Sequence, residues 1–164
     1  MENNSPVLDS DIVKVDKYEP HKIANGKNEV TFFVASDEVN LADLQRYRIQ
    51  AQTEYLIAIT TTNKDYDCLK LADNVILCSP NEVQLVMQAF QLLHSGSGII
   101  GMDWNEVKWA ISSGRNIEFL HGMASGENCV ALACEQLIPK LKNLSSNYPI
   151  KNVMINMYAD ISFG

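Results

Sequence analysis

The pattern of apolar and polar positions predicts strands that alternate with helices from residue 30 onward. Residues 30–35 (V-T-F-F-V-A) and 55–60 (Y-L-I-A-I-T) are nearly continuous in apolar or β-branched side chains, which is typical of strands buried on both faces. Residues 41–52 between them have helical spacing, and Asn40 is the expected N-cap. A strand, a helix and a strand at this spacing form a βαβ unit, so a parallel sheet is expected.

The segment that follows is open to two interpretations. Residues 74–78 (N-V-I-L-C) fit either a third strand or the continuation of a helix that begins near Asp67. Pro80 favours the strand, because proline lacks the N–H group that a continuing helix would need. A second helix is expected over residues 81–94, where apolar side chains recur at helical spacing.

The second half of the chain repeats the alternation of helices and strands. Asp103, with Glu106 three residues later, has the spacing of a capping box and predicts a helix that begins at Trp104. Trp104 and Trp109 are five residues apart, so they leave this helix on different faces, and Trp104 is the expected core residue. A strand is expected over residues 116–121.

A long helix and a last strand complete the predicted order. The helix follows a turn at residues 122–126 and runs to Asn143, and four of its apolar side chains are expected to face inward: Val130, Ala133, Leu137 and Leu141. The last strand is expected over residues 150–158. Because two strands alone are marginal in water, the strands at 116–121 and 150–158 should join the upstream sheet or pair with another chain.

The domain organisation follows from these elements. Residues 1–28 are polar and have no sustained periodicity, so they are expected to form a flexible arm with one short ordered piece around residues 12–15. Residues 29–98 and 99–164 are expected to form two subdomains. The predicted fold is α/β, with a mostly parallel sheet of about five strands and flanking helices.

Composition and charge narrow the classes of function. The 164 residues include 13 Lys and Arg against 20 Asp and Glu, a net charge of −7, which argues against nucleic-acid binding. No apolar stretch approaches the roughly 20 residues of a membrane span, and residues 1–10 do not resemble a secretory signal, so a cytoplasmic protein is expected. The four cysteines and three histidines lack the close spacing of zinc ligands, and no metal or cofactor is expected.

Three segments of the second half carry a resemblance to a known family. They are G-I-I-G-M-D-W-N-E-V at residues 98–107, G-M-A-S-G-E-N at 122–128 and I-K-N-V-M-I-N at 150–156. In order and spacing they resemble the G-x-I-N-x-D-F-A-D-V, A-S-G-E-(N/D)-R-A and G-V-L-(V/L)-N-I motifs of FtsZ, the bacterial tubulin-like cell-division GTPase. The resemblance covers residues 70–158 and implies a nucleotide-type subdomain with its central helix, followed by the first part of the C-terminal domain.

The resemblance implies a candidate site and also a loss of activity. The family's G-G-G-T-G-(S/T)-G loop, whose backbone N–H groups cradle the phosphates, is absent from this sequence, so this chain on its own is not expected to bind or hydrolyse GTP. In the family, carboxylates of the first motif polarise the attacking water in the next subunit. Asp103 and Glu106 occupy these two positions, so they are the candidate catalytic residues if this loop serves a partner's GTP site. The alternative is that both only cap the helix.

The resemblance then implies a non-catalytic FtsZ-like protein that works by contact with a polymerising cell-division partner. The expected partner is a protein, either FtsZ or a second copy of this chain. Two other interpretations stay open. In the first, the chain is a small α/β binding module unrelated to division. In the second, it is a fragment of a GTPase whose GTP-binding half lies elsewhere.

Overall fold

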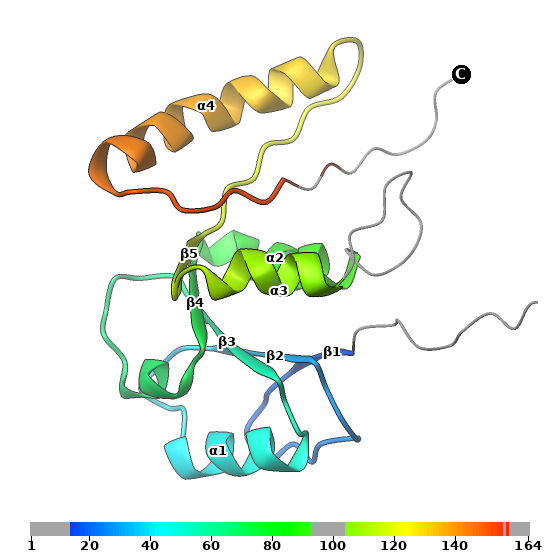
Figure 1. Cartoon of the computed structure of the whole chain (residues 1–164), viewed down its shortest axis with the longest axis vertical. Helices are drawn as coiled ribbons and strands as arrows, with labels where there is room; N and C mark the ends of the chain where they lie inside the picture. The colour runs from blue at the N-terminus through cyan, green and yellow to red at the C-terminus, as the bar shows by residue number, and fades with distance from the viewer. Residues whose placement is uncertain (1–13, 93–103, 156, 158–164) are drawn as a thin grey trace, which may run out of the picture.

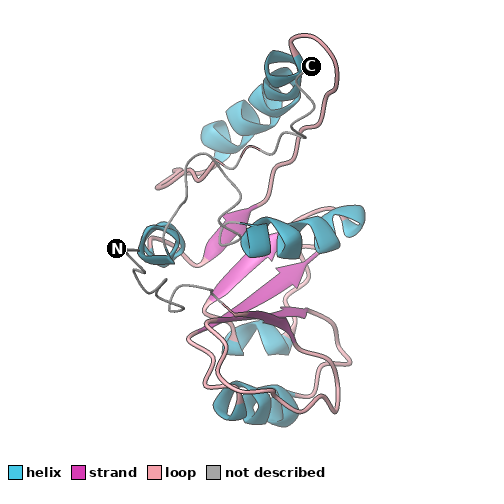
Figure 2. Cartoon of the chain, turned by 90° about the vertical axis from the view of Figure 1, so that its right-hand side faces the viewer, coloured by secondary structure: helices cyan, strands magenta, loops and turns pink. Residues whose placement is uncertain are grey.

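The computed structural model describes residues 14–92, 104–155 and 157. Within these residues the chain forms one five-stranded sheet, all parallel, in which the strands lie in chain order (Figures 1 and 2). The strands are β1 (Val15–Lys17), β2 (Val30–Val34), β3 (Tyr55–Thr60), β4 (Asn74–Leu77) and β5 (Asn116–Glu118). The helices are α1 (Leu41–Gln50), α2 (Val83–Leu92), α3 (Trp104–Ser112) and α4 (Cys129–Asn147), with two short 3₁₀ helices, η1 (Asp67–Leu71) and η2 (Pro80–Glu82). The predicted α/β fold is confirmed.

The βαβ unit and the third strand form as the sequence predicts. Asn40 caps α1, since its side-chain oxygen accepts a hydrogen bond from the backbone N–H of Asp43 at 3.1 Å. β2 and β3 pair along five residues and bury nearly all of their side chains. Residues 74–77 form a strand rather than the end of a helix, and Pro80 starts the turn that leads into α2.

Each face of the sheet is covered by its own helical layer. One core lies between the sheet and α2 and α3, and its largest fully buried members are Phe32, Ile57, Ile59, Ile76, Val30, Val86 and Val107. The other core lies between the sheet and α1 and η1, and it includes Phe33, Leu44, Tyr47, Leu56 and Ala58. Figure 2 shows the strands between these two layers.

The chain changes faces after β4. The connections from β2 to β3 and from β3 to β4 pass over the face covered by α1 and η1, whereas the helices between β4 and β5 cover the opposite face. Because all these steps advance in the same direction across the sheet, the last crossover has the opposite hand to the others. Crossovers of opposite hand within one parallel sheet are uncommon, since most parallel crossovers are right-handed.

The expected flexible arm needs a correction. Of the ordered piece expected around residues 12–15, residues 12 and 13 lie outside the described residues, and Val15 begins β1, Val15–Lys17, which pairs in parallel with β2. The residue after it, Tyr18, is buried against α1, with its ring 5.4 Å from that of Tyr47. Residues 14–28 therefore belong to the folded unit as the edge of the sheet. A polar sequence misleads here because an edge strand needs few apolar side chains.

The last two predicted elements also differ from the structure. α4 begins at Cys129 and runs to Asn147, and none of its residues is fully buried. Of the four positions predicted to face inward, Val130 and Leu141 are exposed, so the prediction is wrong for them, whereas Ala133 and Leu137 are half-buried. The described residues at 150–155 and 157 form no strand. The strand expected over 116–121 forms as the shorter β5 and pairs with β4, so for this strand the first of the two expected outcomes holds: it joins the upstream sheet.

Candidate functional site

The carboxylates singled out by the sequence lie at the start of α3. Asp103 is outside the described residues. Glu106 is in the first turn of α3 and its side chain is exposed. The helix begins at Trp104, as the capping pattern predicts. Both interpretations of Asp103 and Glu106 therefore stay open: a helix cap, or a site that serves a partner's nucleotide.

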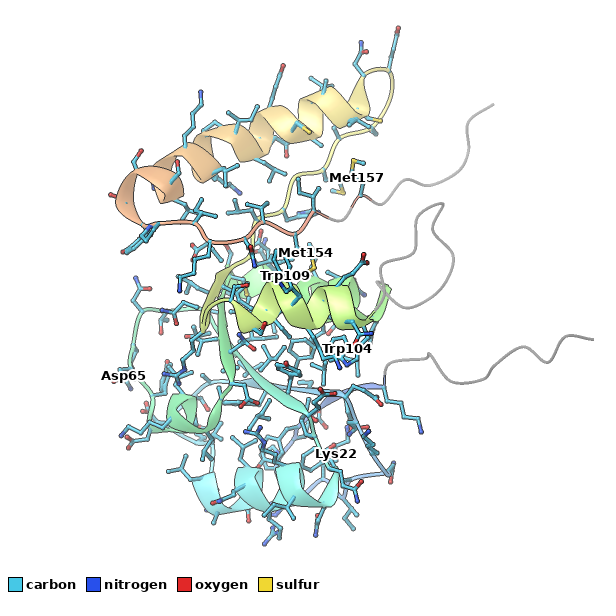
Figure 3. All side chains as sticks on the ribbon, in the orientation of Figure 1. Lys22, Asp65, Trp104, Trp109, Met154 and Met157 are labelled. Carbon is cyan, nitrogen blue, oxygen red and sulfur yellow. The ribbon has the colours of Figure 1, made fainter. Side chains whose placement is uncertain are left out.

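The start of α3 is anchored at the amino end of β3. The Trp104 ring packs edge to face on Tyr55, with 5.8 Å between the ring centroids, and its Nε1 donates a hydrogen bond to Glu54. The Lys108 ammonium lies 3.4 Å from the other carboxylate oxygen of Glu54. Trp109, in contrast, is 69% exposed (Figure 3), so the two tryptophans differ as the sequence predicts. This anchor fixes Glu106 at the amino edge of the sheet.

The segment that carries the A-S-G-E-N motif is a tight connection into α4. Gly126 and Asn128 both have a left-handed backbone, with φ of 84° and 62°, a conformation that glycine and asparagine adopt most readily. Asn128 occupies the N-cap position of α4, but its side chain makes no capping hydrogen bond. The chain therefore enters α4 through a backbone turn and without a side-chain cap from Asn128.

Three contacts hold the C-terminal part of the chain together. A Cβ atom on Gly122 would lie 2.6 Å from the backbone oxygen of Ala133, so the chain passes directly against α4 at this glycine. The Gln136 side chain donates to the backbone oxygen of Met123 and accepts from its N–H. The Asn152 side chain donates a hydrogen bond to Ser113, which joins the segment after α4 to the end of α3.

This C-terminal part exposes many large apolar side chains. Side chains that are 37–76% exposed lie on α4 and on the segments flanking it. We call them the C-terminal apolar set: Met123, Val130, Leu132, Ile138, Leu141, Tyr148, Ile150, Val153, Met154, Ile155 and Met157 (Figure 3). Single exposed apolar residues are ordinary on protein surfaces, whereas a contiguous exposed apolar patch of more than a few hundred Å² is typical of an interaction site.

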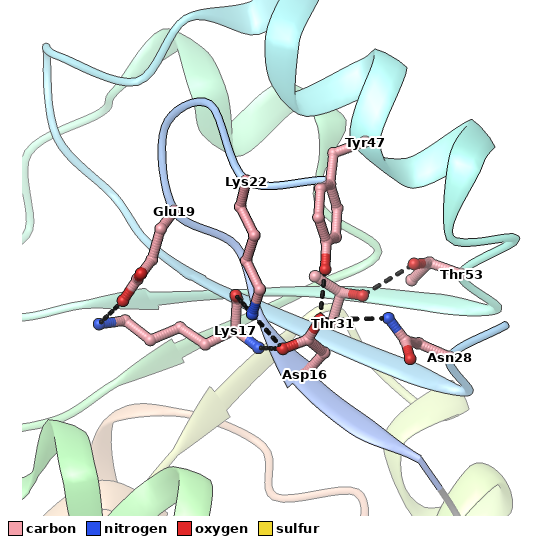
Figure 4. Close-up of polar contacts among 8 residues, drawn as sticks. All are labelled: Asp16, Lys17, Glu19, Lys22, Asn28, Thr31, Tyr47 and Thr53. Carbon is pink, nitrogen blue, oxygen red and sulfur yellow. Dashed lines mark hydrogen bonds and ion pairs between the residues drawn. The ribbon is translucent and has the colours of Figure 1, made fainter. Parts of the chain in front are cut away.

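A polar cluster around Asp16 was missed by the sequence analysis. The Asp16 carboxylate accepts hydrogen bonds from the Tyr47 hydroxyl, the Lys22 ammonium at 2.5 Å and the backbone N–H of Lys17 at 2.7 Å, and Asn28 lies 3.5 Å away (Figure 4). Burial alone would raise the pKa of this carboxyl, but the hydrogen bonds outweigh it and hold the pKa below its usual range. Burial raises the pKa of Tyr47, and the hydrogen bond to Asp16 adds to the shift.

This cluster fastens the edge of the sheet rather than forming an active site. Tyr47 is only 2% exposed, so its hydroxyl is not accessible to a substrate. The lowered pKa keeps Asp16 ionised, which is the form that accepts all of these hydrogen bonds. The cluster ties β1 to α1 and to the loop that leads into β2.

The two buried thiols do not point to nucleophilic chemistry. All four cysteines are free, and two of them, Cys68 and Cys78, are buried. Burial raises the pKa of both buried thiols, which keeps them protonated and weakly nucleophilic. No group of three or more His, Cys, Asp or Glu residues suited to a metal ion occurs in the described ranges. No helix described in the structure is both long and apolar enough to cross a bilayer.

Comparison with known proteins adds no relative. No family model, no curated protein and no solved structure matches the chain. The resemblance to FtsZ therefore rests on the three sequence motifs, and the case for a contact surface rests on the geometry of the C-terminal part.

Proposed function

We propose that this chain is a non-catalytic, FtsZ-like protein that acts by contact with a polymerising cell-division partner in the cytoplasm. The observation that carries the contact is the C-terminal apolar set, attached to a fold whose two sheet faces are already covered. The division partner is suggested by the motifs at residues 98–107, 122–128 and 150–156. Two of these three motifs lie in the same part of the chain as the apolar set.

The size of the exposed side chains makes the contact testable. Burying an isoleucine side chain contributes about 1.5–3 kcal/mol, so replacing one at the centre of an interface weakens binding by about tenfold or more. Ile155 is 72% exposed, and no described contact of the fold depends on it. Ile23 is 76% exposed in the loop between β1 and β2, far from α4 along the chain, and supplies a matched control.

The test is co-sedimentation with FtsZ that is assembling in the presence of GTP. The wild-type chain should pellet with the polymer, the Val153→Ser/Ile155→Ser variant should pellet much less, and Ile23→Ser should behave as wild type. Circular dichroism checks that all three chains are folded. Absence of the wild-type chain from the pellet, or equal pelleting of the double variant, would reject the proposal.

The candidate carboxylates are tested on the partner's GTPase. If the loop serves a partner's nucleotide, Asp103→Ala or Glu106→Gln should abolish any stimulation of the partner's GTP turnover, since the attacking water loses its acceptor. Losing a cap costs only about 1 kcal/mol of stability, so the variants should still pellet. Glu135→Gln on α4 is the control. Unchanged stimulation in both variants leaves helix capping as their role.

The missing glycine loop predicts the behaviour of the chain alone. Without converging backbone N–H groups there is no cradle for phosphate oxygens, so isothermal titration with GTP and Mg²⁺ should show no saturable binding. Micromolar binding would instead indicate a GTP site of another kind. Restored GTP turnover on adding a separate chain that carries the glycine loop would support the GTPase-fragment interpretation.

A binding module unrelated to division is the second candidate. It is favoured by the pairing of β5 with β4, which makes a single continuous sheet of the two expected subdomains. Concentration-dependent light scattering by the wild-type chain that Val153→Ser/Ile155→Ser removes, with no pelleting by FtsZ, would support this candidate with a second copy as the partner.

A further inference from the structure

A crevice opens where the chain changes faces. After β3 the chain turns toward the face that carries η1, and after β4 it turns toward the face that carries α2. Neighbouring connections that leave the carboxyl ends of parallel strands in opposite directions open a space between them, and ligands of α/β sheets bind there. A cavity of about 450 Å³ lies at this place, lined by Thr61 after β3 and by Cys78 and Ser79 after β4.

α4 and the end of β5 complete the cavity. Glu118, Phe119 and Leu120 line it from the end of β5, and Lys140 and Leu144 line it from α4. Several of these side chains are apolar, and the hydroxyls of Thr61 and Ser79 interrupt them. Its volume falls in the range of sites for small molecules.

Two residues of opposite charge, Glu118 and Lys140, line this cavity, and both are exposed. Within the described part of the chain, neither the Glu118 carboxylate nor the Lys140 ammonium takes part in a hydrogen bond or an ion pair, so they do not neutralise each other. Burial raises the pKa of the Glu118 carboxyl, and no nearby cation offsets this. The other carboxylate of the lining, Glu82, is already engaged, since it accepts a hydrogen bond from the backbone N–H of Ser79 at 2.9 Å.

We propose that this cavity binds a small apolar zwitterion, of the class of free aliphatic α-amino acids and their dipeptides. The ligand's ammonium pairs with Glu118, its carboxylate pairs with Lys140, and its aliphatic side chain lies against Phe119 and Leu144. A nucleotide does not fit this lining, because one lysine among two carboxylates is a poor match for phosphates. This site is separate from the C-terminal apolar set, so it stands independently of the proposed function.

The experiment is titration calorimetry with two zwitterions, L-leucine and leucyl-leucine, which distinguishes a free amino acid from a peptide. Leucinamide, which lacks the carboxylate, and 4-methylpentanoate, which lacks the amine, are the paired probes. Both charges lie on exposed side chains, where an ion pair contributes little, so losing one of them should weaken binding by about two- to fivefold. Each single-charge probe should therefore bind at least that much more weakly than L-leucine.

Variants assign the two charges. Glu118→Gln should weaken binding of the zwitterion and of leucinamide but leave 4-methylpentanoate unaffected. Lys140→Met should weaken binding of the zwitterion and of 4-methylpentanoate but leave leucinamide unaffected. Two control variants, Glu135→Gln and Lys142→Met, change residues of α4 that do not line the cavity, and both should bind as wild type. Saturable binding of either zwitterion with this pattern supports the site. No saturable binding by the folded wild-type chain, or equal binding by Glu118→Gln and wild type, would overturn it.

Discussion

Asn74 joins the two halves of the chain through one buried side chain. It begins β4, is 3% exposed, and its Nδ2 donates to the backbone oxygens of Ile111 at 2.8 Å and Gly114 at 2.9 Å. These two oxygens lie at the end of α3 and just after it. The amide thereby holds the last turn of α3 against the sheet, at the point where the chain turns into β5.

The cost of removing this amide follows from the two bonds. Asn74→Ala leaves two carbonyl oxygens without their donor, one of them in a buried contact and the other in a partly buried one. Each hydrogen bond contributes about 1 kcal/mol net, and a buried group left unpaired costs about 1–3 kcal/mol. We expect Asn74→Ala to lower the free energy of unfolding by about 2–4 kcal/mol.

Asn74→Asp adds a dependence on pH. An ionised carboxylate would face two carbonyl oxygens, so the folded state favours the protonated acid and raises its pKa above the unfolded value of about 3.9. The raised pKa means that stability is lost as pH rises. Relative to Asn74→Ala, the aspartate variant should be least destabilised below about pH 4 and most destabilised at neutral pH.

Urea unfolding followed by circular dichroism measures both variants. Asn81→Ala, an exposed asparagine in η2, is the matched control and should stay within about 0.5 kcal/mol of wild type. An effect of Asn74→Ala as small as the control's would refute the reasoning, because it would mean that α3 does not depend on this contact.

Three further predictions probe other parts of the molecule. Gly122→Ala places a Cβ atom 2.6 Å from a backbone oxygen of α4, so hydrogen exchange of the α4 amides should speed up, whereas Gly114→Ala, with open space around it, should leave them unchanged. The lowered pKa of Asp16 means that its carboxylate stabilises the fold above about pH 4 and that this stabilisation is lost as the pH falls further. In Asp16→Asn, thermal stability should therefore fall less steeply below about pH 4 than in the wild type. A thiol reagent should modify the exposed Cys134 in the folded chain, and Cys68 should react only on unfolding.

The central part of the fold was predictable from the sequence because local signals agree with tertiary packing there. Residues 55–60 are apolar and β-branched, and both of their faces meet a helical layer in the structure. Asn40 caps a helix by a contact with Asp43, three residues away. Signals of this range are visible in a single sequence.

Features that depend on distant residues were not predictable. The Asp16 cluster joins Asp16 to Tyr47, 31 positions later, and no periodicity marks either residue as its partner. The cavity depends on where α4 comes to rest beside the end of β5, for which Lys140 and Glu118 give no local signal. Residues 15–17 of β1, a valine followed by two charged residues, have little strand propensity of their own, so the sequence indicated only a short ordered piece around residues 12–15 and no strand.

The wrong prediction for α4 has a physical cause that also explains the exposed surface. The helical pattern of α4 identifies which side chains favour burial, but burial needs an uncovered apolar surface to pack on. α1 and η1 cover one face of the sheet, and α2 and α3 cover the other. α4 therefore lies beside the carboxyl ends of the strands, where its residues line a cavity and do not pack into a core. Its remaining apolar side chains therefore stay exposed, and this exposure is the observation on which the proposed contact with a second protein rests.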